Sequence, residues 1–547
     1  MCARAILQPA APVLGQLTVE HRCDKITVLE TVPPLLGGIP MLNLLEYLEG
    51  TAARLPDKPA FCDEGRVFTF GELWQFARRC GTAIARRVDT VNRPIVVLTG
   101  RTAVTAAAFQ AVLASGNYYA PVDEAMPQAR MEAILNQLQP PLLLYAPGQE
   151  EAAARLAHLC PTLNVDEAAR EDPDDALLER RRAQVLDVDP AYAIFTSGST
   201  GTPKGIVCHH RGVIDLAEWL AQAGRFTGDD VLGNQAPFYF DGSVKDVYMT
   251  LKCGCTCHIL PKKLFMFPKL LVDALNEKEI TTLAWATSAV HLVAASGVLK
   301  QHRPEYLNKV LAGGEAFQAK SLNAWRAALP GVRYINLYGP TETTVDAAWY
   351  EVDREFADGE PIPIGEPCRN TQLLVLGEDL RPVPDGQVGE LCVRGMGLAC
   401  GYYGDWDKTR AAFIQNPLNV HYPDRIYRTG DLCFRGADGL LYFAARQDGQ
   451  IKHMGYRIEL GEVETALNGL DGVEAVCFFD QERDKIVCVC RTALTDKEIV
   501  AAIREKLPRY MQPNLYRRVE AMPYNANGKI DRVRLKEEYF GETDHKL

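Results

Sequence analysis

Helix-like periods alternate with short apolar runs along the chain from about residue 41 to about residue 440. One amphipathic stretch puts five apolar side chains on a single helical face, namely Leu73, Phe76, Ala77, Cys80 and Ile84. Three continuous apolar runs have the length and composition of buried strands: Ile95–Leu98, Leu142–Tyr145 and Tyr192–Phe195. This alternation predicts an α/β fold in which helices cover a largely parallel sheet. The acidic stretch Glu171–Asp175 is typical of a solvated connection between two subdomains.

The pattern changes after about residue 448. The stretch Glu462–Leu470 is helix-like, and Val473–Phe479 and Lys485–Cys490 are typical of paired strands. Thr495 with Glu498 forms a capping box that opens a further helix. We therefore predict a large N-terminal domain of layered α/β subdomains at 41–445, and a small mobile α+β domain at 449–547.

The first 40 residues lack such a pattern. Pro9 and Pro12 interrupt a mildly apolar stretch, and a small-residue cleavage site is missing, which argues against a signal peptide. A helical pattern begins at Met41 and continues through Leu45 and Leu48. Residues 1–40 are predicted to be a loose N-terminal extension, or to precede the true start of the protein.

Composition excludes several classes of function. The net charge of −11 argues against a nucleic-acid-binding surface, which needs clustered Lys and Arg. No run of about 18 apolar residues is long enough to span a membrane. The 16 cysteines are scattered, as in a reduced cytoplasmic protein rather than a disulfide framework. The chain is predicted to be a cytoplasmic enzyme.

The strongest local signal is Thr-Ser-Gly-Ser-Thr-Gly-Thr-Pro-Lys-Gly at 196–205, directly after an apolar run. Glycines let the backbone turn tightly, the hydroxyls act as neutral donors, and Lys204 adds a positive charge. These properties predict a loop that binds a polyphosphate. It is not a Walker A loop, because Pro203 and Gly205 stand where that pattern needs Gly and Ser or Thr.

Eight other motifs accompany this loop in a fixed order: Phe68–Leu73, Leu113–Asp123, Phe240–Ser243, Asn336–Thr343, Gly389–Cys392, Tyr427–Asp431, Leu507–Met511 and Asn527–Asp531. With them, the chain resembles the adenylate-forming superfamily and, within it, the adenylation domains of nonribosomal peptide synthetases. The resemblance covers about 41–540. It implies that ATP and Mg²⁺ activate an amino acid as an acyl-AMP. The acyl group then passes to the phosphopantetheine thiol of a carrier protein in trans.

That reaction brings two anions together, so the site must supply positive charge and in-line positioning. The resemblance implies that Lys529 bridges the substrate carboxylate and the α-phosphate. It also implies that Thr341 touches the α-phosphate, that Glu342 holds Mg²⁺, a hard cation that prefers oxygen ligands, and that Lys204 acts with the phosphate loop.

Further nucleotide contacts follow from the same resemblance. Tyr338 is expected to stack on adenine, Asn336 to bind its exocyclic amine, Asp431 to accept from the ribose hydroxyls, and Arg446 to contact ribose or phosphate. The remaining residues assigned to ATP are Thr196, Ser197, Gly198, Ser199, Thr200, Gly201, Gly314 and Glu315.

The resemblance also assigns a hinge to 446–448, with Asp448 as the position at which the small domain rotates between the two half-reactions. After rotation Lys529 withdraws and the segment Lys452–Arg457 faces the thiol tunnel. Ala445 and the pair His453-Met454 depart from the usual residues of the family. The departures put in doubt how the carrier arm is held.

Asp241 matches the position that binds the substrate's α-ammonium, and a buried carboxylate needs such a partner. The alternative is a capping Asp before a turn. The other pocket positions implied are Gly242, Lys245, Ala284, Leu311, Gly313, Leu337, Val345 and Asp346, with Lys529 at the carboxylate. Lys245 and Asp346 either pair with each other or bind a polar side chain. The set is most similar to pockets for glutamate or glutamine.

Three rival interpretations remain open. A D-alanine–carrier-protein ligase shares nearly all these motifs, and an acyl-CoA ligase for a small carboxylic acid shares many. A catalytically inactive protein that senses ATP or acyl-AMP is the third. The cysteines at 253, 255 and 257 are expected to lie on one face of a strand as core residues, because their spacing does not match a zinc site.

Overall fold

The computed structural model describes residues 41, 43–198, 203–447, 449–481, 483–524 and 530–544, without the side chains of 533 and 540–544. Several of the predicted sites lie outside the described residues: Ser199, Thr200 and Gly201 of the phosphate loop, the hinge residue Asp448, and Lys529. The extension at 1–40 lies outside them as well, and these predictions stay predictions.

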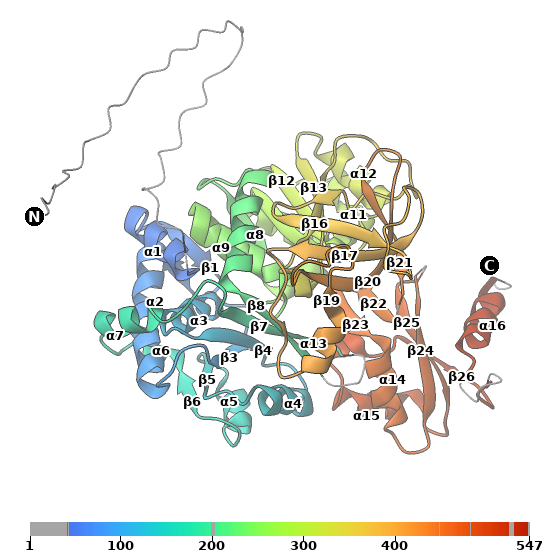
Figure 1. Ribbon diagram of the computed structural model, residues 1–547, viewed down its shortest axis with the longest axis horizontal. Helices are drawn as coiled ribbons and strands as arrows, with labels where there is room; N and C mark the ends of the chain where they lie inside the picture. Colours follow the sequence, from blue (N-terminus) through green and yellow to red (C-terminus); the bar gives the residue numbers. More distant parts are fainter. Residues whose placement is uncertain are drawn as a thin grey trace, which may run out of the picture. The chain divides into compact units, whose positions relative to one another are not determined.

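Two large sheets carry most of the described fold (Figure 1). In the first, the order is β15-β14-β13-β12-β11-β9-β10-β1-β2, and the strands from β13 to β1 are parallel. Its strands are β1 (Pro59–Cys62), β2 (Val67–Thr69), β9 (Val231–Asn234), β10 (Thr256–Ile259), β11 (Thr282–Ala286), β12 (Lys309–Gly313), β13 (Arg333–Tyr338), β14 (Ala348–Glu351) and β15 (Glu366–Pro367).

The second sheet has the order β18-β8-β7-β4-β3-β5-β6, in which β7, β4, β3, β5 and β6 are parallel. Its strands are β3 (Pro94–Thr99), β4 (Tyr118–Asp123), β5 (Leu142–Tyr145), β6 (Thr162–Asn164), β7 (Pro190–Thr196), β8 (Lys204–His209) and β18 (Gly401–Tyr402). The three apolar runs expected to be strands are β3, β5 and β7. The prediction of layered α/β structure is confirmed.

Most of the helices that cover these sheets bury an apolar face, whereas α3 (Ala103–Ala114) is buried on all sides. The five apolar residues expected on one face are all buried in α2 (Phe70–Arg87). The other helices before residue 449 are α1 (Leu45–Arg54), α3 (Ala103–Ala114), α4 (Gln128–Leu138), α5 (Glu150–Leu156), α6 (Val165–Ala168), α7 (Asp175–Arg182), α8 (His210–Ala223), α9 (Gly242–Cys253), α10 (Pro268–Glu277), α11 (Thr287–Ala295), α12 (Ala319–Ala328) and α13 (Trp406–Ala412). Three 3₁₀ turns accompany them: η1 (Lys262–Met266), η2 (Val298–Lys300) and η3 (Thr341–Thr343).

The interpretation of Glu171–Asp175 as a connection between subdomains is wrong. β7 and β8, which follow it, join the same sheet as β3 to β6, which precede it. The acids are not merely solvated either, since Glu171 pairs with Arg86 and Arg87 of α2. The segment therefore links two parts of one sheet and is fastened to the helix that covers it.

A third, antiparallel sheet follows, with the order β16-β17-β20-β19 and β21 paired to β20. It contains β16 (Thr371–Leu376), β17 (Gly389–Gly395), β19 (Phe413–Gln415), β20 (Arg425–Arg435) and β21 (Leu441–Arg446). Its inward side chains form a core with Tyr338 and Ala348 of the first sheet. This packing places β20 and β21 beside the end of β13.

The C-terminal residues form a unit with its own hydrophobic cores, drawn in orange and red in Figure 1. Its elements are β22 (Gln450–His453), β23 (Tyr456–Glu459), α14 (Leu460–Asn468), β24 (Glu474–Asp480), β25 (Lys485–Arg491), α15 (Asp496–Arg504), η4 (Arg509–Met511), β26 (Leu515–Arg518) and α16 (Arg532–Asp544). The expected pairing of β24 with β25 and the capping box at Thr495 and Glu498 are confirmed. The exact domain boundaries stay a prediction.

Among the described helices, none combines the length and apolarity needed to cross a membrane.

His210 makes folding depend on pH. Its side chain is buried at the start of α8, and its Nδ1 accepts a hydrogen bond from the Leu44 backbone N–H at 3.3 Å. Burial lowers the pKa of His210 to about 4. At a pH between the ordinary histidine pKa and this lowered value, His210 is protonated in the unfolded chain but neutral in the folded protein. Its titration therefore lowers the free energy of unfolding as the pH falls.

We expect the contribution of His210 to the free energy of unfolding to fall by about 2 kcal/mol between pH 7.5 and pH 5. Urea unfolding of the wild type and His210→Gln at both pH values measures it. The variant is expected to be less stable at pH 7.5 but to lose about 2 kcal/mol less on acidification. The same pH dependence in both proteins would contradict this role.

Candidate active site

The carboxyl ends of parallel strands from both large sheets meet at one cavity of about 400 Å³. Thr99 and Asp123 reach it from the ends of β3 and β4, and Ala286 and Gly313 from the ends of β11 and β12. Ligands of open α/β sheets bind at such carboxyl ends. The volume lies in the range of small-molecule sites.

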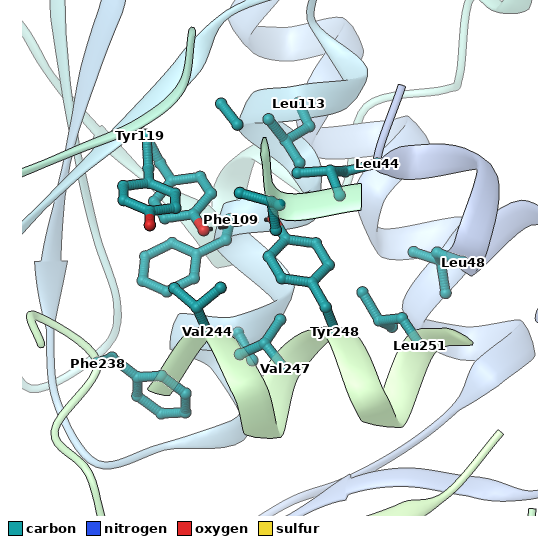
Figure 2. Close-up of a cluster of buried hydrophobic side chains, with 14 of the residues drawn as sticks. Leu44, Leu48, Phe109, Leu113, Tyr119, Phe238, Val244, Val247, Tyr248 and Leu251 are labelled. Atoms are coloured by element: carbon teal, nitrogen blue, oxygen red, sulfur yellow. Dashed lines mark hydrogen bonds between the residues drawn. The ribbon is translucent and has the colours of Figure 1, made fainter. Parts of the chain in front are cut away.

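α9 forms one wall of this cavity and is firmly anchored. Figure 2 shows one face of α9 turned toward α1 and α3. The apolar side chains of that face are Val244, Val247, Tyr248 and Leu251, all fully or almost fully buried. The Tyr248 hydroxyl also lies 3.3 Å from the Tyr119 hydroxyl of β4. This packing fixes the first turn of α9, where the cavity residues stand.

Asp241 stands at the N-cap of α9 and lines the cavity, but its carboxylate makes no capping hydrogen bond. The capping alternative considered from the sequence is therefore wrong. Burial raises the pKa of Asp241, although a hydrogen bond from Thr341 and the charge of Lys245 partly oppose that effect. A ligand cation would favour the ionised carboxylate.

Lys245 lies one turn after Asp241 on α9 and also lines the cavity. Its Nζ is 3.2 Å from Oδ1 of Asp346, so the two charges that the sequence left open form a buried ion pair. Oδ2 of Asp346 is buried and has no hydrogen-bond partner in the part of the chain that is described. Burial raises the pKa of Asp346 despite the nearby ammonium. Oδ2 of Asp346 is therefore available to accept a hydrogen bond from a ligand.

The turn that carries Asp346 is strained. Thr344 and Val345 have φ values of 55° and 75°, a left-handed conformation that β-branched residues rarely adopt. Gly339 approaches this turn so closely that an added Cβ would lie 2.3 Å from the Val345 carbonyl oxygen. Such strain persists only where the surrounding structure fixes it, and it is concentrated at functional sites.

The structure brings most of the predicted pocket together. The predicted residues that line the cavity are Asp241, Gly242, Lys245, Ala284, Gly313, Val345 and Asp346. Leu311 and Leu337 instead lie in the hydrophobic core between the strands and α9. Arg101, Tyr239 and Trp285 also line the cavity and were not expected from the sequence. Arg101 follows directly after β3, so the rule that ligands bind at the carboxyl ends of strands could have identified it.

At the start of the phosphate loop, one polar side chain lacks a partner in the described part of the chain, and the next two residues bond to the C-terminal unit. Oγ1 of Thr196 is buried without a hydrogen-bond partner among the described residues. Ser197 donates a hydrogen bond to the Arg457 carbonyl at 2.8 Å, and the Gly198 N–H donates to Glu462 at 3.2 Å. The loop end therefore contacts the C-terminal unit directly.

Glu342 is completely buried at the centre of a charged cluster. Its Oε2 accepts a hydrogen bond from Arg457 at 2.6 Å, and its Oε1 accepts one from the Tyr402 hydroxyl at 2.9 Å. Nζ of Lys204 lies 3.6 Å from Oε1. Burial alone would raise the pKa of Glu342, but the charges of Arg457 and Lys204 outweigh it and lower that pKa.

The side chains assigned to adenine and ribose lie together at the end of β13. The Tyr338 hydroxyl donates to Oδ2 of Asp431 at 2.5 Å, and Arg446 donates to Oδ1 of Asp431 at 2.6 Å. The Asn336 amide donates to the Pro363 carbonyl at 2.7 Å, which leaves its Oδ1 as an acceptor. These groups come from two sheets, which explains why motifs far apart in sequence form one site.

The hairpin of β22 and β23 covers this site. The Gly455 N–H donates to Glu315 at 2.6 Å, beside Gly314, which lines the cavity. Nζ of Lys452 lies 5.6 Å from the centroid of the Tyr338 ring. The predicted segment Lys452–Arg457 is therefore the part of the C-terminal unit that contacts the cavity. The pairing of Arg457 with Glu342 was not expected, because nothing local in the sequence indicates it.

The three cysteines at 253, 255 and 257 do not share one strand. Cys253 ends α9, Gly254 caps it with a φ of 77°, and only Cys257 of the three thiols lies in β10. The expectation of three cysteines on one strand is wrong, because the helix continues to Cys253. No cluster of three or more His, Cys, Asp or Glu that could hold a metal occurs in the described part.

Comparison with known proteins agrees with this geometry. A family model for the AMP-binding enzyme matches residues 48–403. The chain belongs to the AMP-binding enzyme family. The matched residues contain both large sheets. They also contain the cavity residues named above that lie between Arg101 and Asp346.

Two relatives and one solved structure show how far the likeness extends. The chain is 31% identical over 502 residues to tyrocidine synthase 1 of Brevibacillus parabrevis, covering 90% of this chain and 45% of that protein. It is 31% identical over 513 residues to the D-alanine–D-alanyl carrier protein ligase of Bacillus licheniformis, covering 91% of this chain and 99% of that protein. The structure of holo-PA1221, an NRPS protein containing adenylation and PCP domains, matches with a TM-score of 0.76 and 25% identity. That match covers 91% of this chain and 84% of the PA1221 chain.

The chain thus spans less than half of tyrocidine synthase 1 but nearly all of the ligase.

Proposed function

We propose that the protein activates an amino acid with ATP as an aminoacyl-AMP, releasing pyrophosphate, and then transfers the aminoacyl group to the phosphopantetheine thiol of a carrier protein. AMP-binding enzymes use ATP, typically with Mg²⁺. One observation carries the choice of an amino acid: the Asp241 carboxylate faces the cavity without capping its helix. An α-ammonium is the partner that such a carboxylate needs.

Adenylation requires groups that neutralise the approaching anions. Lys204 and the phosphate loop bind the phosphates, with the Thr196 hydroxyl, which has no partner among the described residues, as a further donor. Tyr338, Asn336 and Asp431 bind adenine and ribose. Lys529, which lies outside the described residues, bridges the two reacting anions as the resemblance implies.

The residues present fit a magnesium ion that arrives with the phosphates. Mg²⁺ in such sites is held by one or two carboxylates together with substrate phosphates, and Glu342 is a buried carboxylate beside the phosphate loop. When bound, Mg²⁺ offsets the charge that develops on the phosphate oxygens. Arg457 must withdraw from Oε2 of Glu342 before that oxygen can hold the metal.

The position of the β22–β23 hairpin supports an arrangement for the second half-reaction. The hairpin lies against residues assigned to the nucleotide: Gly455 bonds to Glu315, Lys452 lies over the Tyr338 ring, and Arg457 pairs with Glu342. In this arrangement the thiol sulfur bonds to the acyl carbon, the bond from that carbon to the AMP oxygen breaks, and AMP leaves. The thiol proton passes to solvent.

The oxygen of the ion pair that has no partner within the described structure, Oδ2 of Asp346, supports a choice between polar side chains for the substrate. Lys245 can donate to a ligand oxygen, and Oδ2 of Asp346 can accept from a ligand N–H. A terminal amide offers both, whereas a carboxylate would put two anions against one ammonium. We therefore place glutamine before glutamate as the substrate.

Replacing Lys245 with methionine tests this pocket. The variant keeps the length of the side chain but leaves Asp346 without its cation, so we expect about 10²-fold weaker activation of the preferred amino acid. The order of substrates in a pyrophosphate exchange screen should change. An unchanged substrate profile would refute the role of Lys245.

Two alternatives remain distinguishable. A D-alanine–carrier-protein ligase is favoured by the 99% coverage of that relative, whereas the polar pair at Lys245 and Asp346 is unsuited to a methyl side chain. The substrate of an acyl-CoA ligase for a small acid would bring no ammonium to Asp241.

The decisive test is ATP–pyrophosphate exchange across the L- and D-amino acids, followed by mass analysis of carrier proteins bearing phosphopantetheine. Exchange with no amino acid would exclude the proposal. Exchange with D-alanine alone would select the D-alanine ligase, and a thioester on coenzyme A alone would select the CoA ligase.

A further inference from the structure

Three large apolar side chains are exposed together where η1 meets α10. Met266, Phe267 and Leu270 are 73%, 53% and 52% exposed. We call these three residues the rim patch. Their positions, within about one turn of one another, make them neighbours on the surface. Large exposed apolar patches mark interaction sites in folded proteins.

The rim patch is not needed to hold its own segment in place. Phe265 of η1 packs edge to face against Trp285 of β11, with ring centroids 5.3 Å apart. Leu271 and Leu275 of α10 are buried in the core under the first sheet. The segment is therefore anchored through its inner side chains, and the rim patch is presented to solvent on a fixed base.

The rim patch is continuous with the active-site cavity. Lys262 and Phe265, from the same 3₁₀ turn, line that cavity. Met454 lines it from the β22–β23 turn and is itself 57% exposed. An arm that enters the cavity past these residues would bring its protein body against the rim patch.

The positive charge of residues 260–272 is complementary to the phosphate of a phosphopantetheine arm. Residues 260–272 contain Lys262, Lys263 and Lys269 and no acid, although the chain as a whole has a net charge of −11. All three lysines are exposed, and Lys263 makes a solvent-exposed pair with Glu64 at 2.8 Å. A phosphopantetheine arm carries a phosphate at its protein end, where a basic rim is favourable.

We propose that the rim patch, with the lysines beside it, is the docking surface for the carrier protein that delivers the phosphopantetheine thiol. The inference rests on the proposed function and adds where the partner binds. An apolar surface of the carrier covers Met266, Phe267 and Leu270, the phosphate lies at the lysines, and the arm passes Phe265 and Met454 into the cavity.

The test uses the double variant Met266→Ser/Phe267→Ser in the full chain. Its matched control is Val420→Ser/Tyr422→Ser, which removes two other exposed apolar side chains, 84% and 60% exposed, that do not line the cavity. Three rates are compared: pyrophosphate exchange, acylation of free pantetheine, and acylation of the carrier protein that the wild type loads fastest from a panel bearing phosphopantetheine.

We expect the rim-patch variant to raise the KM for the carrier at least about 10-fold, since buried aromatic anchors dominate such interfaces. Pyrophosphate exchange and acylation of pantetheine should stay within about twofold of wild type, and the control variant should load the carrier normally.

Three outcomes would overturn the inference. The KM for the carrier could be unchanged, the rates with pantetheine and with the carrier could fall equally, or light scattering could show that the rim patch holds two copies of the chain together. If the wild type loads pantetheine but no carrier, the carrier step of the proposed function fails, and the rim patch loses its partner with it. If exchange itself is absent, the adenylation step has failed instead.

Discussion

Replacing Asp241 with asparagine is expected to lower kcat/KM for the amino acid by about 10²–10³-fold in pyrophosphate exchange. The carboxylate lies at the cavity wall and is not used as a helix cap. Asparagine keeps the shape of the side chain but removes the charge, so a substrate ammonium would be desolvated without an ionic partner. Such a loss costs about 3–4 kcal/mol.

The substitution Asp241→Asn should weaken binding of the amino acid and leave binding of ATP nearly unchanged. Asp241 lies on α9, whereas the groups assigned to adenine and ribose lie at the ends of β13 and on β20 and β21. The KM for ATP is therefore expected to change by less than about threefold. An acid that lacks the α-amino group should be affected little by the substitution, and comparing it with the amino acid isolates the ammonium contact.

Asp246→Asn is the matched control. Asp246 is a buried acid on the same helix, it accepts a hydrogen bond from Asn234 at 2.7 Å, and it does not line the cavity. Burial raises the pKa of Asp246 to about 7, so a neutral amide disturbs this position less than it would a carboxylate of ordinary pKa. We expect exchange within about threefold of wild type. Equal losses in Asp241→Asn and Asp246→Asn would mean that α9 had been disturbed, and normal exchange in Asp241→Asn would refute the ammonium contact.

The fold was largely predictable because its signals are local. The face of α2 and the apolar runs of β3, β5 and β7 depend on the side-chain period alone. The errors arose where the deciding contact is distant or conformational. Glu171 belongs to a connection within one sheet because β7 returns beside β4, and Cys253 lies in a helix because Gly254 adopts the left-handed cap.

The sequence indicated seven of the substrate-pocket residues that line the cavity, but not the contacts between them. The resemblance indicated Asp241, Lys245 and Asp346, yet only the structure shows that the last two pair and leave one oxygen over. Likewise Glu342 was expected to hold Mg²⁺ and Arg457 to end the segment that faces the thiol tunnel, and the two are 115 residues apart in sequence. Their pairing depends on how the β22–β23 hairpin packs on the large sheets, which no local pattern encodes.

Replacing Arg457 with alanine is expected to separate the two half-reactions. The guanidinium pairs with Glu342 in the observed arrangement, in which the hairpin covers the site, and removing one member of a buried pair costs about 3–5 kcal/mol. That cost falls on the covered arrangement, which we assign to thioester formation. We expect transfer to the thiol to slow by about 10²-fold while pyrophosphate exchange stays within about threefold.

Metal binding gives an independent measure of the same contact. Because Arg457 and Mg²⁺ need the same oxygen of Glu342, the alanine variant should bind Mg²⁺ with a non-hydrolysable ATP analogue more tightly than the wild type, as measured by calorimetry. Arg491→Ala, which removes an exposed guanidinium paired with Glu474 on the same unit, should change neither quantity. Arg457→Lys keeps the charge but not the forked geometry and should restore transfer only in part. If the alanine variant slowed both half-reactions equally and left metal affinity unchanged, Arg457 would be a structural residue and not the partner that Glu342 exchanges for the metal.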